Sequence, residues 1–300
     1  MGSNPFGRTI FKKPYFIRLF FILYKILELI IIKLYYIIMD INKKHLIITG
    51  ATGGLGGSLI KSLSDYDCTI TAIGRNNDIL KKLEKEFDIT PLCLDLTSAK
   101  GREKFSDYVK NKPADILINC AAILNIEEFH KCSLNNIDDT ININLTALIT
   151  TSRFCLEHML KKDTRCKIVN VGSIGGDLAL PYFTTYTATK FAVKGFCESL
   201  QRELLGTNVD VILIAPRAMK TPMMDEEAVG LLKAMFSGMD DVDKISRKVI
   251  RTIEKDRSYM RSGILERFGA FANGIFPQIV NIAFYIITPI MKKHVKKMNR

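Results

Sequence analysis

Residues 45–66 read HLIITGATGGLGGSLIKSLSDY and pass from a short apolar run through a glycine-rich turn into a helical pattern. The run HLIIT at 45–49 is typical of a buried strand, and the glycines of 50–57 let the backbone turn tightly before the helix. Backbone N–H groups at such a helix start form a cradle for a pyrophosphate. The spacing is T-G-x-x-x-G-x-G rather than G-x-G-x-x-G, and the absence of a following G-K-[ST] excludes a P-loop.

The alternation of strand-like and helical patterns continues beyond this turn. Further apolar runs lie at 68–74, 91–96, 114–120, 167–173 and 209–216. Six strand candidates with helices between them indicate an α/β protein with a Rossmann-type doubly wound parallel sheet, whose ligand binds at the carboxyl ends of the strands. We expect a single domain over residues 44–265, with a lid at about 222–250, and apolar helical extensions at both ends, in residues 1–43 and 266–300.

Charge and cysteine content limit the classes of function. The 300-residue chain has 47% hydrophobic and 25% charged residues, which excludes a disordered or fibrous protein. Its net charge of +12 is concentrated at two apolar ends: residues 1–45 hold eight Lys/Arg and two acids, and residues 255–300 hold nine and two. Basic and apolar residues together favour an anionic membrane surface over nucleic acid. Seven cysteines without a CxxC pair predict neither a disulfide framework nor a metal site.

The N-terminal extension carries the apolar stretch YFIRLFFILYKILELIIIKLYYIIM at 15–39, which is long enough to cross a bilayer. Its charged residues Arg18, Lys25, Glu28 and Lys33 fall within one sector of about 140° on a helix. Charges on one face suit a helix that lies in the membrane surface, which we favour over a spanning anchor. The alternative is a helix that covers the protein's own core or a dimer partner.

The C-terminal extension has the same character. Residues 268–291 contain no charged side chain, and the chain ends in the polybasic sequence MKKHVKKMNR. Pro277, Pro289, Gly269 and Gly274 are expected to break the apolar segment, and the prolines argue against one straight spanning helix. An apolar segment beside a basic patch supplies two membrane signals. The alternative is a C-terminal helix pair that caps the substrate cavity.

A tyrosine and a lysine on one helix face form the most specific chemical pattern. Tyr186 and Lys190 stand four residues apart in YTATK, thirteen residues after Ser173. A phenol with a pKa of about 10 is a poor acid at neutral pH, and a neighbouring ammonium is expected to lower that pKa. With Ser173 holding a substrate oxygen, the three residues would form a proton-transfer site beside a nucleotide. Ser173 is not in a G-x-S-x-G elbow, which argues against a hydrolase.

The end of the second predicted strand bears on the choice between NAD(H) and NADP(H). Gly74, Arg75 and Asn76 stand there without an acid for the adenosine ribose, and Asp78 already has the character of a helix start. An arginine near this place accommodates a 2′-phosphate. We therefore expect NADP(H) as the cofactor. The alternative is that Arg75 caps a surface loop.

Taken in order, TGATGGLGG, DLT at 95–97, the turn at Asn119, INL around Asn144, Ser173 and YTATK resemble the short-chain dehydrogenase/reductase family over about residues 44–222. The resemblance implies a single Rossmann-type domain that binds a nicotinamide cofactor. It also implies hydride transfer between this cofactor and an alcohol or carbonyl compound. The basic, apolar ends resemble the extensions of members that act on lipophilic substrates.

The resemblance assigns roles to single residues. Tyr186 is the expected catalytic acid/base, and Lys190 lowers its pKa and binds the nicotinamide ribose. Ser173 orients the substrate oxygen, and Asn144 holds a water of the proton relay. The expected cofactor-binding residues are Gly50, Thr52, Gly54, Leu55, Gly56, Arg75, Asp95, Leu96, Asn119, Tyr186, Lys190, Met219 and Thr221.

Two positions depart from the pattern of the family. The family's N-N-A-G ends in Ala122 here, and the glycine usual after Pro216 is Arg217. Neither change removes a catalytic group. Arg217 is expected to alter the nicotinamide-side loop or the substrate entrance.

The expected substrate follows from the segment after Thr221, which is rich in Met, Leu and Phe and suits a long or bulky apolar molecule. We expect an NADP(H)-dependent oxidoreductase that interconverts a carbonyl and an alcohol on a sterol, retinoid, fatty or sphingoid-like substrate. It would be membrane-associated, with the catalytic domain facing the cytoplasm, and a homodimer or homotetramer. The alternatives are a 3-oxoacyl thioester reductase of the soluble type and a non-catalytic NADP-binding sensor or scaffold. The second is disfavoured because all four catalytic positions are kept.

Overall fold

The computed structural model describes residues 20–25, 27, 39–221, 224, 226–234 and 238–298. The chain forms two units, Met1–Ile38 and Met39–Arg300. In the first unit, residues 20–25 and 27 are helical, and their side chains are exposed. The rest of the predicted N-terminal amphipathic helix, with Arg18, Glu28 and Lys33, lies outside the described residues.

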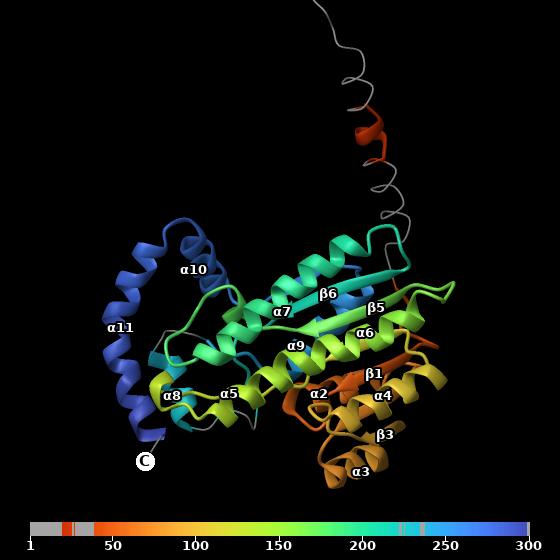
Figure 1. The fold of residues 1–300 in the computed structure, drawn as a ribbon, viewed down its shortest axis with the longest axis horizontal. Helices are drawn as coiled ribbons and strands as arrows, with labels where there is room; N and C mark the ends of the chain where they lie inside the picture. Colours follow the sequence, from red (N-terminus) through yellow and green to blue (C-terminus); the bar gives the residue numbers. More distant parts are fainter. Residues whose placement is uncertain are drawn as a thin grey trace, which may run out of the picture. The chain divides into compact units, whose positions relative to one another are not determined.

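The second unit is built on a parallel sheet (Figure 1). In the part of the chain that the structure describes, seven strands pair in parallel in the order β3-β2-β1-β4-β5-β6-β7. Their bounds are β1 (His45–Thr49), β2 (Thr69–Gly74), β3 (Ile89–Cys93), β4 (Ile116–Asn119), β5 (Cys166–Val171), β6 (Val209–Ala215) and β7 (Tyr259–Arg261). The strand order reverses between β1 and β4, which is where doubly wound sheets bind their ligands. The predicted Rossmann-type sheet is confirmed.

Two strands differ from the prediction. β7 was missed because its three residues, YMR, are too few to form a recognisable apolar run. The third strand was predicted at 91–96 but runs from Ile89 to Cys93. Leu94 and Leu96 leave the sheet, and their side chains are buried in the core on one face of it instead.

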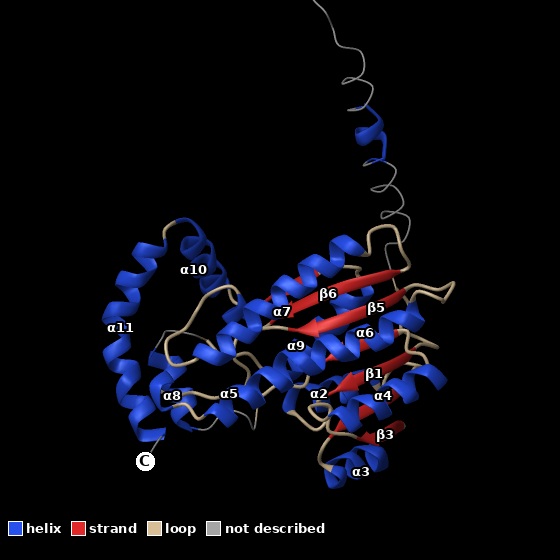
Figure 2. Cartoon of the chain, in the orientation of Figure 1, coloured by secondary structure: helices blue, strands red, loops and turns tan. Residues whose placement is uncertain are grey.

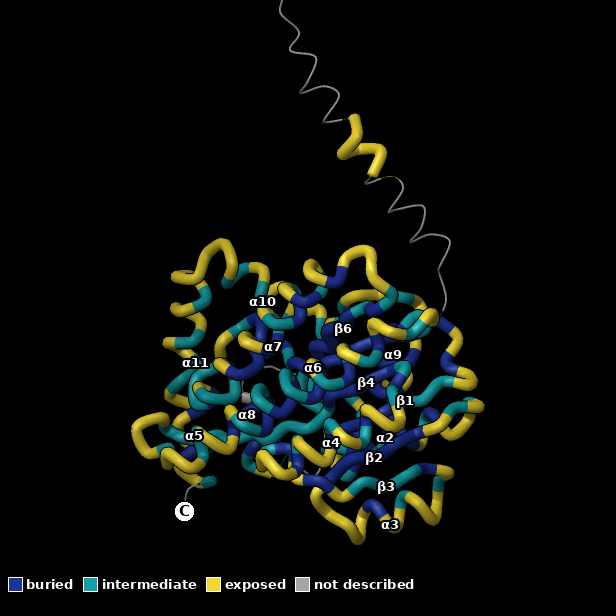
Figure 3. The backbone as a smooth tube through the Cα atoms, turned by 45° about the vertical axis from the view of Figure 1, so that its right-hand side comes forward, coloured by how far each residue is buried: buried dark blue, intermediate teal, exposed yellow. Residues whose placement is uncertain are grey.

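Helices cover both faces of the sheet (Figure 2). One face is covered by α2 (Gly54–Leu63), α3 (Asn77–Glu86) and α9 (Val242–Glu254). The other face is covered by α4 (Ala99–Asn111), α6 (Ala147–Met159) and α7 (Thr184–Glu203). Successive residues of β1 alternate between these cores, Leu46 and Ile48 in the first and Ile47 in the second. The inner strands are accordingly buried (Figure 3), as a parallel sheet requires on both faces, whereas the edge strands β3 and β7 are only partly buried.

The remaining helices lie beyond the carboxyl ends of the strands (Figure 1). They are α5 (Leu134–Ile141), α8 (Glu226–Ala234), α10 (Ile264–Ile275) and α11 (Pro277–Met298). α8 falls in the range predicted as a lid, and α11 packs along it. The first residues of α9 fall in the same range, but α9 packs against α2.

The two C-terminal prolines have different effects. Pro277 begins α11, where its missing N–H is not needed, so a helix break occurs there as predicted. Pro289 lies inside α11, and the predicted break at this residue is wrong. Pro289 has no N–H and therefore removes one hydrogen bond of the helix. The burial of Met291 and Val295, in the turns that follow, offsets this loss. The breaks predicted at Gly269 and Gly274 are wrong as well, because both glycines lie within α10. Among the described residues, no helix combines the length and the apolar character needed to cross a membrane.

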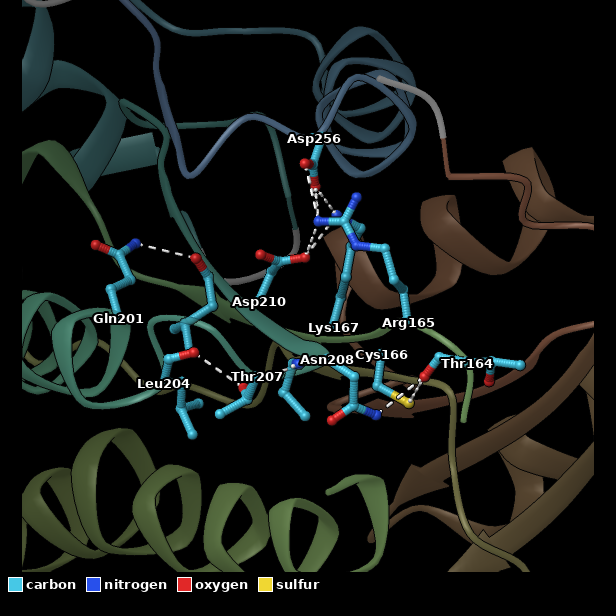
Figure 4. Close-up of polar contacts among 12 residues, drawn as sticks. Thr164, Arg165, Cys166, Lys167, Gln201, Leu204, Thr207, Asn208, Asp210 and Asp256 are labelled. Atoms are coloured by element: carbon cyan, nitrogen blue, oxygen red, sulfur yellow. Dashed lines mark hydrogen bonds and ion pairs between the residues drawn. The ribbon is translucent and has the colours of Figure 1, made fainter. Parts of the chain in front are cut away.

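Four charged side chains meet at the amino ends of β5 and β6 (Figure 4). Lys167 is fully buried; its ammonium pairs with Asp256 and lies 3.6 Å from Oδ2 of Asp210. Arg165 pairs with Asp210, and its Nη2 lies 2.9 Å from Oδ2 of Asp256. Asp256 follows α9 with a φ of +53°, so the network ties the turn between α9 and β7 to the sheet.

Candidate active site

The glycine-rich turn after β1 approaches a neighbouring loop so closely that no side chain fits. A Cβ on Gly50, whose φ is +66°, would lie 2.6 Å from the backbone of Ala121, and one on Gly56 would lie 2.2 Å from the Gly50 carbonyl oxygen. The Thr49 hydroxyl accepts a hydrogen bond from the Cys120 N–H at 3.2 Å. No side chain caps the first turn of α2, so its N–H groups are left for a ligand.

A cavity of about 350 Å³ lies at the carboxyl ends of the strands, beside this turn. The predicted cofactor-binding residues that line it are Gly50, Thr52, Gly54, Leu55, Gly56, Arg75, Asp95, Leu96, Tyr186, Lys190, Met219 and Thr221. Ser173 lines it as well, whereas Asn119 and Asn144 do not. The structure therefore brings the glycine turn, the strand-end residues and the Ser-Tyr-Lys set to one cavity.

Ser173, Tyr186 and Lys190 come from the end of β5 and the first turns of α7. The Ser173 hydroxyl accepts a hydrogen bond from the Gly175 N–H at 3.1 Å. A Cβ on Gly175 would lie 3.5 Å from Ser173 Oγ and 3.6 Å from Cε1 of Tyr186, so both side chains flank this glycine. Lys190 Nζ lies 5.5 Å from the centre of the Tyr186 ring and donates to the Val171 carbonyl oxygen at 3.0 Å. The phenol and the serine hydroxyl thus face the same part of the cavity.

The electrostatics of this set differ from the prediction. Burial raises the pKa of the Tyr186 phenol, although the neighbouring Ser173 hydroxyl acts in the opposite direction. Burial also lowers the pKa of Lys190 to about 8. The lowering of the Tyr186 pKa expected from Lys190 is not found, because desolvation of the phenolate prevails in this geometry.

The two asparagines outside the cavity support its walls. Asn144 lies in a π-helical turn at Asn142–Thr146, and its side chain accepts from the Ile123 N–H at 2.8 Å and donates to the Ile123 carbonyl at 3.0 Å. It therefore fixes Ile123, which lines the cavity. The Asn119 side chain donates to Ser152 Oγ and Asn170 Oδ1, each at 2.9 Å, behind the strand ends.

The far end of the cavity is polar. The Asp95 carboxylate accepts from the Thr97 N–H at 3.0 Å and the Thr97 hydroxyl at 2.7 Å. Burial pushes the pKa of Asp95 upward, but these hydrogen bonds and Arg75 outweigh it and lower that pKa. Arg75 is exposed at the end of β2. Asn76 caps α3 by accepting from Ile79 N–H at 3.0 Å, which confirms that Asp78 belongs to a helix start.

Sequence reasoning found only part of the apolar wall of the cavity. Met224 and Leu232, which line it, belong to the apolar segment after Thr221, whereas Leu124, Leu180 and Phe183 line it as well and were missed. Leu124 and Leu180 lie in the loops after β4 and β5, so the rule that such loops line the ligand site could have found them. Behind this wall, Met291 and Val295 of α11 pack with Phe183 and Leu231 in a separate core, which Tyr186 also contacts.

Comparison with known proteins gives the class of this chain. The profile of the short chain dehydrogenase family matches residues 44–230, more than half of the chain. The chain therefore belongs to the short-chain dehydrogenase family and is an oxidoreductase.

Relatives within this family differ in their substrates. A 3-ketodihydrosphingosine reductase of Mus musculus is 27% identical over 195 residues, which cover 61% of this chain but only 58% of the mouse protein. A 3-oxoacyl-[acyl-carrier-protein] reductase of Buchnera aphidicola is 28% identical over 239 residues, 76% of this chain and 96% of that protein. A short chain dehydrogenase/reductase of Burkholderia phymatum, solved in complex with NAD, has the same fold, with a TM-score of 0.72, 17% identity and coverage of 80% and 96%.

Proposed function

We propose that this protein is an NADP(H)-dependent oxidoreductase that interconverts a carbonyl and an alcohol on a lipophilic substrate. The observation that carries the proposal is the position of the Tyr186 phenol. It shares with Ser173 a cavity that has the glycine turn on one side and an apolar wall on another. Relatives that are reductases of keto compounds support the same reaction type.

Each side chain of the site would have a separate role in such a reaction. A nicotinamide cofactor would supply the hydride in reduction and accept it in oxidation. In reduction, the Ser173 hydroxyl would hold the carbonyl oxygen, and the Tyr186 phenol would donate its proton to that oxygen as the carbon is reduced. The Lys190 ammonium, 5.5 Å from the ring centre, would stabilise the phenolate that remains.

The preference for NADP(H) rests on the exposed guanidinium of Arg75 at the rim of the cavity. No acid stands at the end of β2. Asp78 lies in the first turn of α3, where its negative charge interacts favourably with the helix dipole. An exposed cation at the end of β2 suits the 2′-phosphate of NADP(H). NADP(H) in turn favours reduction as the physiological direction.

The lipophilic substrate is supported by the apolar wall formed by Leu124, Leu180, Phe183 and Leu232. The similarity to a 3-ketodihydrosphingosine reductase favours a long-chain keto compound. The similarity to a 3-oxoacyl-[acyl-carrier-protein] reductase favours the second candidate, a 3-oxoacyl thioester.

Association with a membrane surface is the third part of the proposal. Ile282 and Ile286 of α11 are 63% and 67% exposed, and α10 presents Phe268 and Phe271 to solvent in the same way. Lys292 and the lysines after it follow on the same helix. Apolar side chains next to cations suit an anionic bilayer. The N-terminal extension would supply a second contact with lipid.

The deciding experiment is NADPH oxidation by the detergent-solubilised full-length protein. The substrates would be long-chain ketones and aldehydes, a sterol ketone, a retinoid aldehyde and a 3-oxoacyl thioester, with Tyr186→Phe as the blank. Turnover of an apolar ketone or aldehyde that disappears in Tyr186→Phe is expected. Turnover of the thioester alone would favour the second candidate substrate, a 3-oxoacyl thioester, over a long-chain keto compound. Binding of NADPH without turnover of any substrate would contradict both and favour a sensor.

A further inference from the structure

Arg217 follows β6 at a position where the sequence pattern of the family has glycine. It is the second residue of the loop 216–221, and this loop lines the active-site cavity. The Arg217 side chain also lines a second cavity of about 510 Å³, which it shares with Asp240, Lys248 and Glu266. The arginine thus forms part of the wall between the two cavities.

The guanidinium of Arg217 bridges two other segments of the chain. Its Nη2 lies 2.9 Å from Oδ1 of Asp240, just before α9, and its Nη1 lies 3.7 Å from Oε1 of Glu266, in the first turn of α10. The Arg217 N–H donates to Ser262 Oγ at 2.8 Å. The Arg217 and Asp240 side chains are only 26% and 15% exposed, so solvent screens this pair less than a surface pair.

Two glycines leave room for this arginine and its carboxylate partner. A Cβ on Gly238 would lie 2.3 Å from Nη1 of Arg217. A Cβ on Gly263, whose φ is +79°, would lie 2.1 Å from Oε2 of Glu266 and 3.3 Å from Cδ of Arg217. The side chain at position 217 is therefore fitted to its surroundings.

Backbone contacts join the same segments to the cofactor-side loop. Met219 pairs with Asp240 in a parallel bridge, in which the Asp240 N–H donates to the Ala218 carbonyl at 2.8 Å. The Ser262 N–H donates to the Ala215 carbonyl at 3.2 Å. α10 leads into α11, and α11 packs on α8. The loop is thereby linked through Arg217 to the helices that stand behind the apolar wall.

We propose that Arg217 is a positioning residue whose ion pairs with Asp240 and Glu266 hold the loop 216–221 against the cofactor cavity and tie this loop to α10. The proposal rests on the proposed function, because it takes the cavity to bind NADP(H). The proposal gives a structural role to Arg217, which stands where the family pattern has glycine. Met219, which pairs with Asp240, and Thr221 line the cofactor cavity, and they are the residues whose position would depend on it.

Equilibrium binding of NADPH to the full-length protein tests this proposal, with the fluorescence of the nucleotide as the readout. Asp240→Asn and Glu266→Gln keep the shape of each partner and remove its charge. Each is expected to raise the Kd for NADPH about tenfold, while kcat at saturating NADPH changes less than about twofold. In an Arg217→Gly background, Glu266→Gln is expected to add no further loss of NADPH affinity, because the ion pair with Arg217 is already lost. Arg217→Lys is expected to bind NADPH more tightly than Arg217→Gly.

Arg202→Ala is the matched control, because Arg202 is 74% exposed in its pair with Glu198, 3.6 Å away. It is expected to bind NADPH as the wild type does. Unchanged NADPH affinity in Asp240→Asn and Glu266→Gln would overturn the proposal, and so would a lower melting temperature as their only effect. Additive effects of Arg217→Gly and Glu266→Gln would overturn the link to α10. A wild type that binds no nicotinamide dinucleotide would instead contradict the proposed function itself.

Discussion

Asp256→Asn tests how much the buried charges at the amino ends of β5 and β6 contribute to stability. The substitution leaves the fully buried Lys167 ammonium with Asp210, 3.6 Å away, as its remaining carboxylate. Breaking a buried ion pair costs about 3 to 5 kcal/mol, and the residual Asp210 contact places this case at about 3 kcal/mol. For a chain of this size, the melting temperature should fall by about 6 °C. Urea unfolding at pH 7 would measure the loss directly.

The pH dependence of this effect has a defined sign. Burial acts to raise the pKa of Asp256, but Lys167 and Arg165 outweigh it and lower that pKa. The contribution of Asp256 is therefore present above the carboxyl's unfolded pKa of about 3.9 and is lost as the pH falls through the lower folded pKa. The difference between wild type and Asp256→Asn should shrink in the same acid range.

Two comparisons decide whether the reasoning holds. Lys167→Met combined with Asp256→Asn should recover most of the lost stability, because no buried charge is left without a carboxylate. Glu198→Gln, which removes an exposed pair with Arg202, should cost less than about 0.5 kcal/mol. A loss below about 1 kcal/mol for Asp256→Asn would refute the argument, because it would mean that Lys167 does not need this partner.

Three further substitutions test the candidate site. Gly56→Ala places a Cβ 2.2 Å from the Gly50 carbonyl and should raise the Kd for NADPH at least about tenfold, whereas Gly57→Ala, with 3.7 Å to its nearest atom, should leave it unchanged. Arg75→Ala should raise the KM for NADPH about tenfold and leave the KM for NADH as it is, in steady-state assays with both nucleotides. The pKa of Lys190 falls from 10.5 to about 8 on burial, so the folded state binds fewer protons between these values and stability should rise with pH there. Lys190→Met should abolish that rise in urea unfolding; an equal rise in the variant would contradict the assigned pKa.

The parts of the fold that the sequence predicted well are those with strong local patterns. The turn after β1 has glycines that no other residue can replace, and the strand before it is a continuous apolar run. β7 has neither feature, and it pairs with β6 through tertiary contacts that a linear pattern does not show. A local pattern predicts a helix break at Pro289, but α11 continues through it. The burial of Met291 and Val295, which stabilises the helix beyond Pro289, depends on packing against α8 and Phe183, and no local pattern shows this packing.

The candidate site was predictable to the extent that its residues belong to ordered motifs. Tyr186 and Lys190 follow from their spacing on one helix, but the sign of the Tyr186 pKa shift depends on burial, which spacing does not reveal. The apolar wall draws Leu124 and Phe183 from loops without a pattern. The partners of Arg217, at positions 240 and 266, stand too far along the chain for any local signal to find them.

The packing of α11 on α8 has a consequence for the order in which the protein is made. The strands β1 to β6 and the glycine turn leave the ribosome well before Pro277–Met298, so the nucleotide half of the site can fold while the chain is still being synthesised. Phe183 and Leu231 stay uncovered until Met291 and Val295 pack against them. During that interval the nascent protein exposes an apolar surface beside a finished Rossmann core. A chaperone that binds apolar segments would meet its target there, and a stop codon that removes α11 would release a chain that folds its sheet without completing its substrate wall.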